Sequence, residues 1–294
     1  MLTEPTDTGV IYVAKGPAYF ELALASAHSL RDMNPGLAVD IFTDQPGLAA
    51  AAGLFDRILP LPEPPLRAKI ICLPMSRFAR TLYLDCDTLV VKPFGDLFAI
   101  LDRFDLAVAH DVRRVSPLIR EGHAEKTPYA FPQMNCGVLL FRRSSATAAF
   151  FAEWSRRYLE AGKARDQVTF KDLIWSSDIR FYVLPPEFNL RRVTMLDAWE
   201  PLDALPTIIH SHRLLDHLRG TDAPRVRTLA EILRLERTAL HREWLTRGLP
   251  ARATPGEDPS ARFRDLDQMP AFAPIWPGPG GNGAGSRRQR GRLT

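Results

Sequence analysis

The stretch Arg80–Val91, RTLYLDCDTLVV, is the most informative part of the sequence for predicting the fold. Its apolar run is typical of a buried β-strand, yet Asp85 and Asp87 stand one residue apart at the end of that run. Buried carboxylates cost stability unless a partner compensates them, and a metal cation is the most economical partner. The stretch therefore predicts a cation site at the carboxyl end of a strand, which is the edge where open α/β sheets bind ligands.

The segments around this stretch alternate between strand and helix patterns, which favours a mostly parallel sheet with helices on its faces. Strands are expected at Gly9–Gly16, Ala38–Asp44, Thr81–Asp87, Phe104–Asp111, Asn135–Ser144, Ile179–Leu190 and Pro206–His212. Helices are expected at Tyr19–Pro35, Leu66–Met75, Ser145–Gly162 and Arg227–Gly248. We predict one α/β domain over 1–250 and a Pro/Gly/Arg-rich, disordered tail over 251–294.

Composition narrows the functional class. Hydrophobic residues make up 46% of the 294 residues and charged residues 24%, as in an ordinary globular protein. The net charge is +4, but the last nine residues, SRRQRGRLT, hold four arginines and no acid, so a nucleic-acid partner is not expected. The cysteines Cys72, Cys86 and Cys136 form no CxxC pair and indicate reduced thiols. With no secretory leader and no apolar run of about 18 residues, the sequence predicts a cytoplasmic protein without a transmembrane segment.

The Asp-x-Asp pair is the central candidate site. Residues i and i+2 of a strand project to the same side, so Asp85 and Asp87 would converge on one cation. Oxygen ligands suit Mn²⁺ or Mg²⁺, and either ion can bridge a nucleotide diphosphate. His210 follows the apolar run TII and could complete the ligand set, with His212 on the same side if the strand continues. The alternatives are that the two acids cap the next turn and that the His-x-His pair is structural.

Two further segments carry polar residues beside apolar runs. In FPQMNCGVLLF, Asn135 and Gly137 precede a strand and suggest a loop that approaches a ligand closely; a simple turn explains them equally well. In KARDQVTF, Asp166 and Gln167 follow a helix, and a helix N-cap is the alternative interpretation.

Together these motifs resemble the nucleotide-sugar glycosyltransferases of the GT-A fold, in particular the glycogenin-like and bacterial lipopolysaccharide sugar-transferase families. The resemblance covers roughly Gly9 to His212. Its parts are, in order, IYVA, SLR, IFTD, a lysine ahead of LYLDCDTLV, NCGVLLF, a DQ pair, FNLR and IIHSH. The order and spacing make this pattern far more specific than any single motif.

The resemblance implies a role for each matching residue. Asp85, Asp87 and His210 would be metal ligands, and Asp85 would also border the donor. Lys69 would lie near the donor, Asn135 and Gly137 would form the Asn-x-Gly loop near the donor sugar, and Gln167 would bind substrate. The same resemblance places the Asp166 carboxylate close to the reacting sugar and implies retention of configuration. The family's Gly followed by Lys-Pro-Trp is missing after the histidine, where SHRLLDHLRG offers Arg213 or Arg219 instead.

The predicted function is therefore a Mn²⁺- or Mg²⁺-dependent transfer of a sugar from a nucleoside-diphosphate sugar to a hydroxyl of a glycan, lipid or protein acceptor. Asp166 and Asn135 are the predicted catalytic residues. A sugar-phosphate nucleotidyltransferase is an alternative, although VAKGPAYF lacks the glycine density of a phosphate loop. A non-catalytic nucleotide-sugar-binding protein on the same scaffold is the other alternative.

Overall fold

A computed structural model of the chain describes residues 7–62, 68–114, 116–198, 200, 202–218, 225–226 and 228–246. The chain divides into two compact units, Met1–Ala239 and Leu240–Thr294. Of the second unit the structure describes only 240–246, the end of the last helix, so the predicted tail at 251–294 lies outside the described residues. The fold and site below belong to the first unit.

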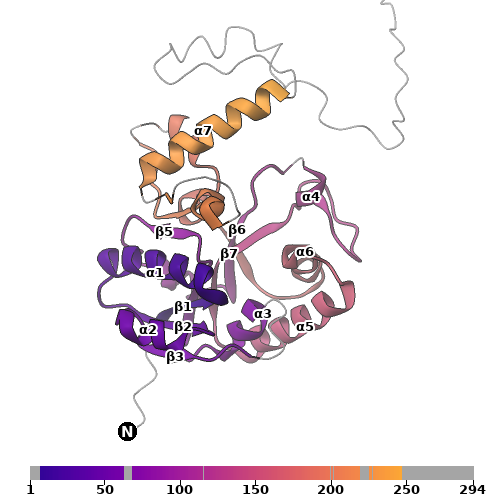
Figure 1. Ribbon diagram of the computed structural model, residues 1–294. Helices are drawn as coiled ribbons and strands as arrows, with labels where there is room; N and C mark the ends of the chain where they lie inside the picture. Colours follow the sequence, from indigo (N-terminus) through magenta and orange to yellow (C-terminus); the bar gives the residue numbers. More distant parts are fainter. Residues whose placement is uncertain are drawn as a thin grey trace, which may run out of the picture. The chain divides into compact units, whose positions relative to one another are not determined.

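Within the described residues, seven strands form one mixed sheet in the order β3-β2-β1-β4-β7-β6-β8 (Figure 1). Their bounds are β1 (Thr8–Ala14), β2 (Ala38–Thr43), β3 (Arg57–Leu59), β4 (Arg80–Leu84), β6 (Leu106–His110), β7 (Met134–Arg142) and β8 (Phe181–Leu184). Four neighbouring pairs are parallel, and only β7 runs antiparallel to its neighbours β4 and β6. This confirms the predicted α/β fold with a mixed, mostly parallel sheet.

A small antiparallel sheet pairs β5 (Thr88–Val90) with β9 (Ile208–His210). The α-helices are α1 (Gly16–Met33), α2 (Pro46–Ala52), α3 (Ala68–Cys72), α4 (Pro117–Arg120), α5 (Ser145–Ala161), α6 (Asp166–Ser176) and α7 (Leu229–Thr246). Short 3₁₀ turns lie at Leu73–Met75, Leu97–Asp102, Pro186–Phe188, Val193–Ala198 and His212–Leu218. Among the described residues, no helix combines the length and apolar character that a membrane crossing requires.

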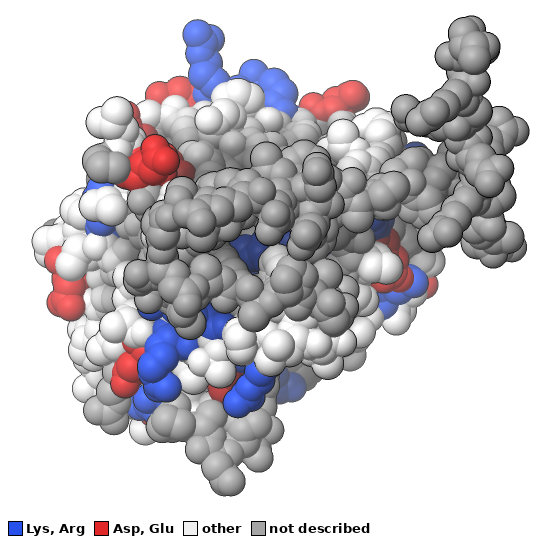
Figure 2. Space-filling model, turned by 90° about the horizontal axis from the view of Figure 1, so that it is seen from above, with Lys and Arg blue, Asp and Glu red and all other residues white. Residues whose placement is uncertain are grey.

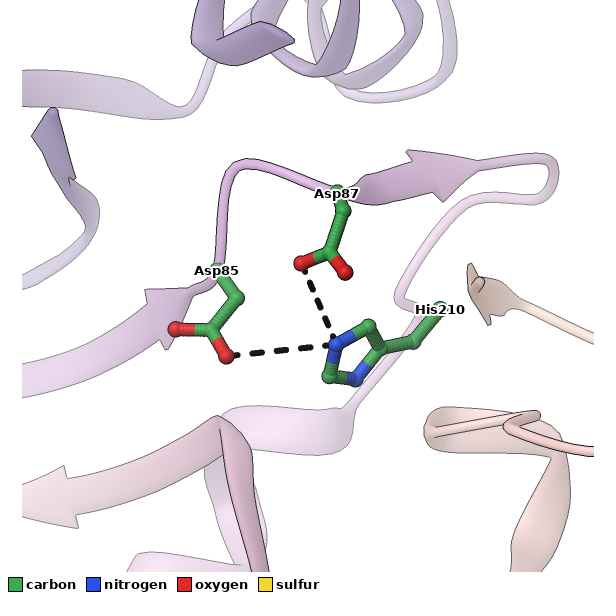
Figure 3. Close-up of side chains that lie close together, drawn as sticks. All are labelled: Asp85, Asp87 and His210. Atoms are coloured by element: carbon green, nitrogen blue, oxygen red, sulfur yellow. Dashed lines mark ion pairs between the residues drawn. The ribbon is translucent and has the colours of Figure 1, made fainter. Parts of the chain in front are cut away.

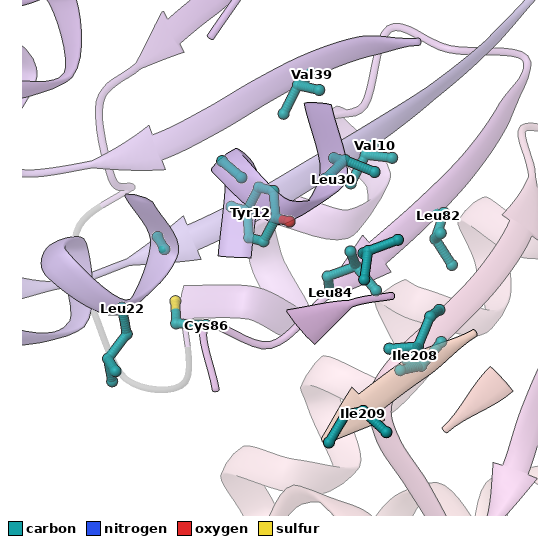
Figure 4. Packing of buried hydrophobic residues seen from close by; sticks show 14 of the residues in the cluster. Val10, Tyr12, Leu22, Leu30, Val39, Leu82, Leu84, Cys86, Ile208 and Ile209 are labelled. Carbon is teal, nitrogen blue, oxygen red and sulfur yellow. The ribbon is translucent and has the colours of Figure 1, made fainter. Parts of the chain in front are cut away.

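Side-chain alternation along the strands builds a core on each face of the sheet. On β1, Val10 and Tyr12 join a cluster that includes α1 residues and the β9 residues Ile208 and Ile209 (Figure 4). Ile11, between them in sequence, joins the opposite cluster with side chains of α3, α5 and α6. The sheet is therefore covered on both faces, and the polar residues at the ends of its strands are the candidates for a ligand site.

Five of these helices and strands were not expected from the sequence, namely α2, β3, β5, α4 and α6. The end of the decisive strand also differs from the prediction. β4 ends at Leu84, and Asp85–Asp87 form the turn that leads into β5. The alternation of a continuous strand therefore cannot explain why the two carboxylates converge; the turn between β4 and β5 does so.

Candidate metal and donor site

The candidate site lies at the edge of the sheet where β4 and β6 end. Because β7 is antiparallel to both, its first residues lie at the same edge. β6 and β7 change register here, since Val108 pairs with Leu139 but Ala109 pairs with Asn135. Such bulges redirect side chains next to functional sites. The sequence placed Asn135 and Gly137 in a loop before a strand, but both lie within β7, next to this bulge.

Asp85, Asp87 and His210 come together from two segments of the chain, the turn between β4 and β5 and the end of β9 (Figure 3). One ligand atom from each residue lies within 4.8 Å of the others. His210 Nε2 is 3.2 Å from Asp87 Oδ1 and 3.9 Å from Asp85 Oδ2. β5 carries Asp87 to this point because its Thr88 pairs directly with His210 of β9.

Hydrogen bonds on the side of the His210 ring away from the carboxylates set the orientation of that ring. Asn189 Oδ1 lies 2.9 Å from His210 Nδ1. An amide oxygen only accepts, so Nδ1 carries a proton, and Nε2 is the ring nitrogen that faces the two carboxylates. The Asn189 amide nitrogen in turn donates to Oδ1 of Asn135 at 3.1 Å. Such partners orient metal-binding histidines in other proteins.

The surroundings of Asp87 hold its carboxylate as an anion. Burial alone would raise the pKa of Asp87, but His210, His212 and Arg191 outweigh it and hold that pKa well below its usual range. Tyr83 donates its hydroxyl to Asp85 Oδ1. Burial, with the Asp85 charge adding to it, raises the pKa of Tyr83, so the phenol stays a donor. Asp85 and Asp87 therefore present acceptor oxygens.

Gly137 is required by close packing against the same cluster. A Cβ built on it would lie 2.1 Å from His210 Cε1 and 2.6 Å from Asp85 Oδ2. Those distances are far inside van der Waals contact, so any side chain would push the imidazole and a carboxylate away. The resulting group consists of two carboxylates and the imidazole Nε2, packed against a glycine. Such a group suits a divalent cation such as Mn²⁺ or Mg²⁺.

Lys69 and Asp166 form a buried ion pair beside this cluster. Lys69 Nζ lies 2.7 Å from Asp166 Oδ2 and 3.9 Å from Asp85 Oδ1. Burial alone would lower the pKa of Lys69, but the Asp166 and Asp85 carboxylates outweigh it and raise that pKa. Asp166 is the first residue of α6, while Arg165 takes the N-cap position without a side-chain hydrogen bond. The alternative of a simple N-cap is therefore wrong for Asp166.

Gln167 binds its neighbours rather than facing solvent. Its amide nitrogen donates to Asp111 Oδ2 at 2.9 Å and to the Met134 carbonyl at 2.7 Å. Asn135 Nδ2 also points to Asp111 Oδ2, at 3.4 Å. The structure thus brings Lys69, Asn135, Gly137, Asp166 and Gln167 into one polar cluster with the three candidate ligands.

Asp111, Asn189 and Arg191 belong to this cluster, and the sequence analysis gave none of them a role. Asp111 could have been found because it ends the apolar run LAVAH as Asp85 ends LYL. Asn189 and Arg191 lie in the FNLR motif, which carried the resemblance without an assignment. His212 is outside the group of three, but its Nδ1 lies 3.5 Å from Asp87 Oδ2.

Comparison with known proteins agrees with this arrangement. Residues 77–214 match the profile of a family described as nucleotide-diphospho-sugar transferase. That segment is a little under half of the chain, and it contains Asp85, Asp87, Asn135, Asp166 and His210. No significant match was found among curated proteins.

Solved structures share the fold at low sequence identity. The glycosyltransferase GlyE of Streptococcus pneumoniae is 18% identical with a TM-score of 0.53, over 84% of this chain and 66% of GlyE. This chain therefore spans just under two thirds of GlyE. The galactosyltransferase LgtC, crystallised with donor and acceptor sugar analogs, is 16% identical with a TM-score of 0.52, over 81% of this chain and 99% of LgtC. The bifunctional glycosyltransferase WbbM is 16% identical with a TM-score of 0.50, over 71% and 46%.

The chain has the GT-A fold. The family profile matches residues 77–214, and the solved glycosyltransferases GlyE and LgtC share this fold. An Asp-Asp-His group at the end of β4 lies within the matched segment.

Proposed function

We propose that the protein transfers a sugar from a nucleoside-diphosphate sugar to an acceptor hydroxyl, with a divalent cation held by Asp85, Asp87 and His210. The observation that carries the proposal is the convergence of these three side chains within 4.8 Å at the carboxyl edge of the sheet. The donor set fits Mn²⁺ or Mg²⁺, and Gly137 lets His210 and Asp85 pack closely enough to form it. When bound, such an ion supplies positive charge that stabilises the leaving diphosphate.

The nucleoside part of the donor has room at the same edge. A cavity of about 400 Å³ lies at the carboxyl ends of β1, β2 and β3 and is lined by Lys15, Thr43, Asp44, Pro46 and Ile58–Leu61. Ligands of open α/β sheets bind at this edge. The cavity and the metal-ligand group are thus compatible with one extended donor lying across the strand ends.

The chain's own residues would orient the donor sugar. The side-chain amides of Asn135 and Gln167 both point to the Asp111 carboxylate. Lys69 Nζ lies 2.7 Å from Asp166 Oδ2, so a positive charge faces that carboxylate. We propose retention of configuration, with the Asp166 carboxylate near the anomeric carbon. It would act there as a nucleophile or as a stabiliser of positive charge during front-face attack.

A cytoplasmic location is part of the proposal. Cys72, Cys86 and Cys136 are free and buried, as expected of a protein from a reducing compartment. On the face shown in Figure 2, basic and acidic residues are interspersed over the described surface. That distribution does not resemble a nucleic-acid-binding face, which gathers Lys and Arg.

Donor binding and hydrolysis across a panel of nucleotide sugars test this function, with Mn²⁺ and with chelator. Asp87→Ala should abolish the metal-dependent signal. Asp267→Ala is a matched control, because it removes an acid from the second Asp-x-Asp, which lies outside the described residues. If no donor gives a metal-dependent signal with the wild type, the proposal fails. Pyrophosphate release from a nucleoside triphosphate and a sugar phosphate would indicate a nucleotidyltransferase, and tight donor binding without turnover would indicate a binding protein.

A further inference from the structure

Arg191 lies beside the metal-ligand group because of how its segment pairs with β9. Leu190 forms a parallel bridge with Ile209, and its N–H donates to the Ile208 carbonyl. The N–H of His210 donates back to the Leu190 carbonyl. The segment therefore runs alongside β9 and places Arg191 next to the turn that carries His212.

Arg191 is linked to Asp87 through His212. Arg191 Nη2 lies 2.6 Å from His212 Nε2. A guanidinium group only donates, so Nε2 accepts and the proton of His212 is on Nδ1. That Nδ1 lies 3.5 Å from Asp87 Oδ2. The chain Arg191–His212–Asp87 thus holds the guanidinium close to a predicted metal ligand without neutralising it by a direct carboxylate contact.

Two nitrogens of this guanidinium are unused. Nε and Nη1 of Arg191 are buried, and neither has a hydrogen-bond partner within the part of the chain that the structure describes. In the same part, Arg191 makes no ion pair with a carboxylate. Buried charged donors without acceptors are costly, so a site that retains them is suited to an anionic ligand that supplies oxygens.

Two other cations suggested by the sequence, Lys69 and Arg213, are already paired with carboxylates. Lys69 pairs with Asp166 and Asp85. Arg213, which the sequence suggested as a phosphate-binding substitute, pairs with Asp216 at 2.9 Å and Glu236 at 3.2 Å. The other suggested substitute, Arg219, lies outside the described residues.

We propose that Arg191 binds the diphosphate oxygens of the donor through its free guanidinium donors, while His212 holds the side chain in position. The inference rests on the proposed function, because it assumes a nucleoside-diphosphate ligand at the Asp85–Asp87–His210 group. A planar guanidinium matches phosphate geometry better than an ammonium group does, so arginine is the suitable residue at this position.

Calorimetric binding of nucleoside diphosphates and monophosphates, with Mn²⁺ present, tests the inference. The wild type is first screened with diphosphates of each base, and the tightest base is kept. Arg191→Ala should lose roughly 10- to 100-fold in diphosphate affinity and much less in monophosphate affinity. Arg191→Lys should restore part of the loss. Arg156→Ala is the matched control, because Arg156 is an exposed arginine of α5 that pairs with Glu153 and Glu160.

The outcomes separate this inference from the proposed function. A wild type that binds no nucleoside diphosphate overturns both. Wild-type binding that Arg191→Ala leaves unchanged overturns the inference alone. An equal loss for mono- and diphosphate also overturns it, since that result indicates a structural role. If Arg191→Ala does not fold, the comparison of Arg191→Lys and Arg191→Gln decides, because only the lysine keeps a positive charge.

Discussion

Asn189 is expected to control metal affinity without touching the metal. Its side chain receives the Nδ1 proton of His210 at 2.9 Å and donates to Asn135 Oδ1 at 3.1 Å and to the Asn135 carbonyl at 3.3 Å. All three residues are buried. In Asn189→Ala the Nδ1–H loses its acceptor, so the ring is free to rotate or to change tautomer, and Nε2 no longer faces the carboxylates.

The size of the effect follows from these contacts. Loss of a hydrogen-bond partner behind a metal ligand costs roughly 10- to 100-fold in metal affinity, which corresponds to about 1.4 to 2.8 kcal/mol. Asn189→Asp keeps an acceptor for His210 but loses the donor toward Asn135. We therefore expect Asn189→Asp to retain more Mn²⁺ affinity than Asn189→Ala.

Mn²⁺ titration followed by electron paramagnetic resonance measures this affinity independently of transfer. It is run with and without the nucleoside diphosphate that the wild type binds best. Asn34→Ala is the control. Oδ1 of Asn34 also accepts one hydrogen bond, from the Phe94 N–H at 3.0 Å, but Asn34 lies at the end of α1 away from the site. Wild-type Mn²⁺ affinity in a folded Asn189→Ala variant would refute the argument that this amide orients His210.

Three further predictions concern neighbours of the site. Gly137→Ala should abolish Mn²⁺ binding and transfer, because its Cβ has no room, whereas Gly36→Ala, with nothing within 4 Å, should be silent in both assays. Asp166→Asn should leave the Lys69 ammonium buried without a full counter-charge. The free energy of unfolding, measured in urea, should fall by about 3 to 5 kcal/mol. A variant with wild-type stability and wild-type transfer would contradict both the ion-pair role and the catalytic role of Asp166. Asp172 Oδ2 accepts three consecutive backbone N–H groups, at 2.7, 2.6 and 3.2 Å. Asp172→Ala should destabilise the protein by about 1 to 3 kcal/mol and expose residues 123–125 to limited proteolysis, and an unchanged digestion pattern would count against this anchor.

Local sequence patterns were enough to predict the fold class and to name most residues of the candidate metal and donor site. Strand and helix periods are local properties, so the alternation of β1, α1, β2 and β4 was readable from residue spacing. The acids after LYL were also readable, because a carboxylate at the end of a buried strand needs an explanation wherever it occurs. The resemblance then added Lys69 and, through the order of motifs along the chain, gave roles to the candidates His210, Asn135 and Gly137.

The spatial arrangement of these residues could be seen only in the folded structure. A turn, not strand alternation, brings Asp85 and Asp87 together, and the pairing of β5 with β9 delivers His210 to them from more than a hundred residues away. The roles of Asn189 and Arg191 depend on a bridge between Leu190 and Ile209 that leaves no periodic signal. Residue spacing reflects contacts within one helix or strand. Contacts between distant segments depend on tertiary packing, which produces no local sequence pattern.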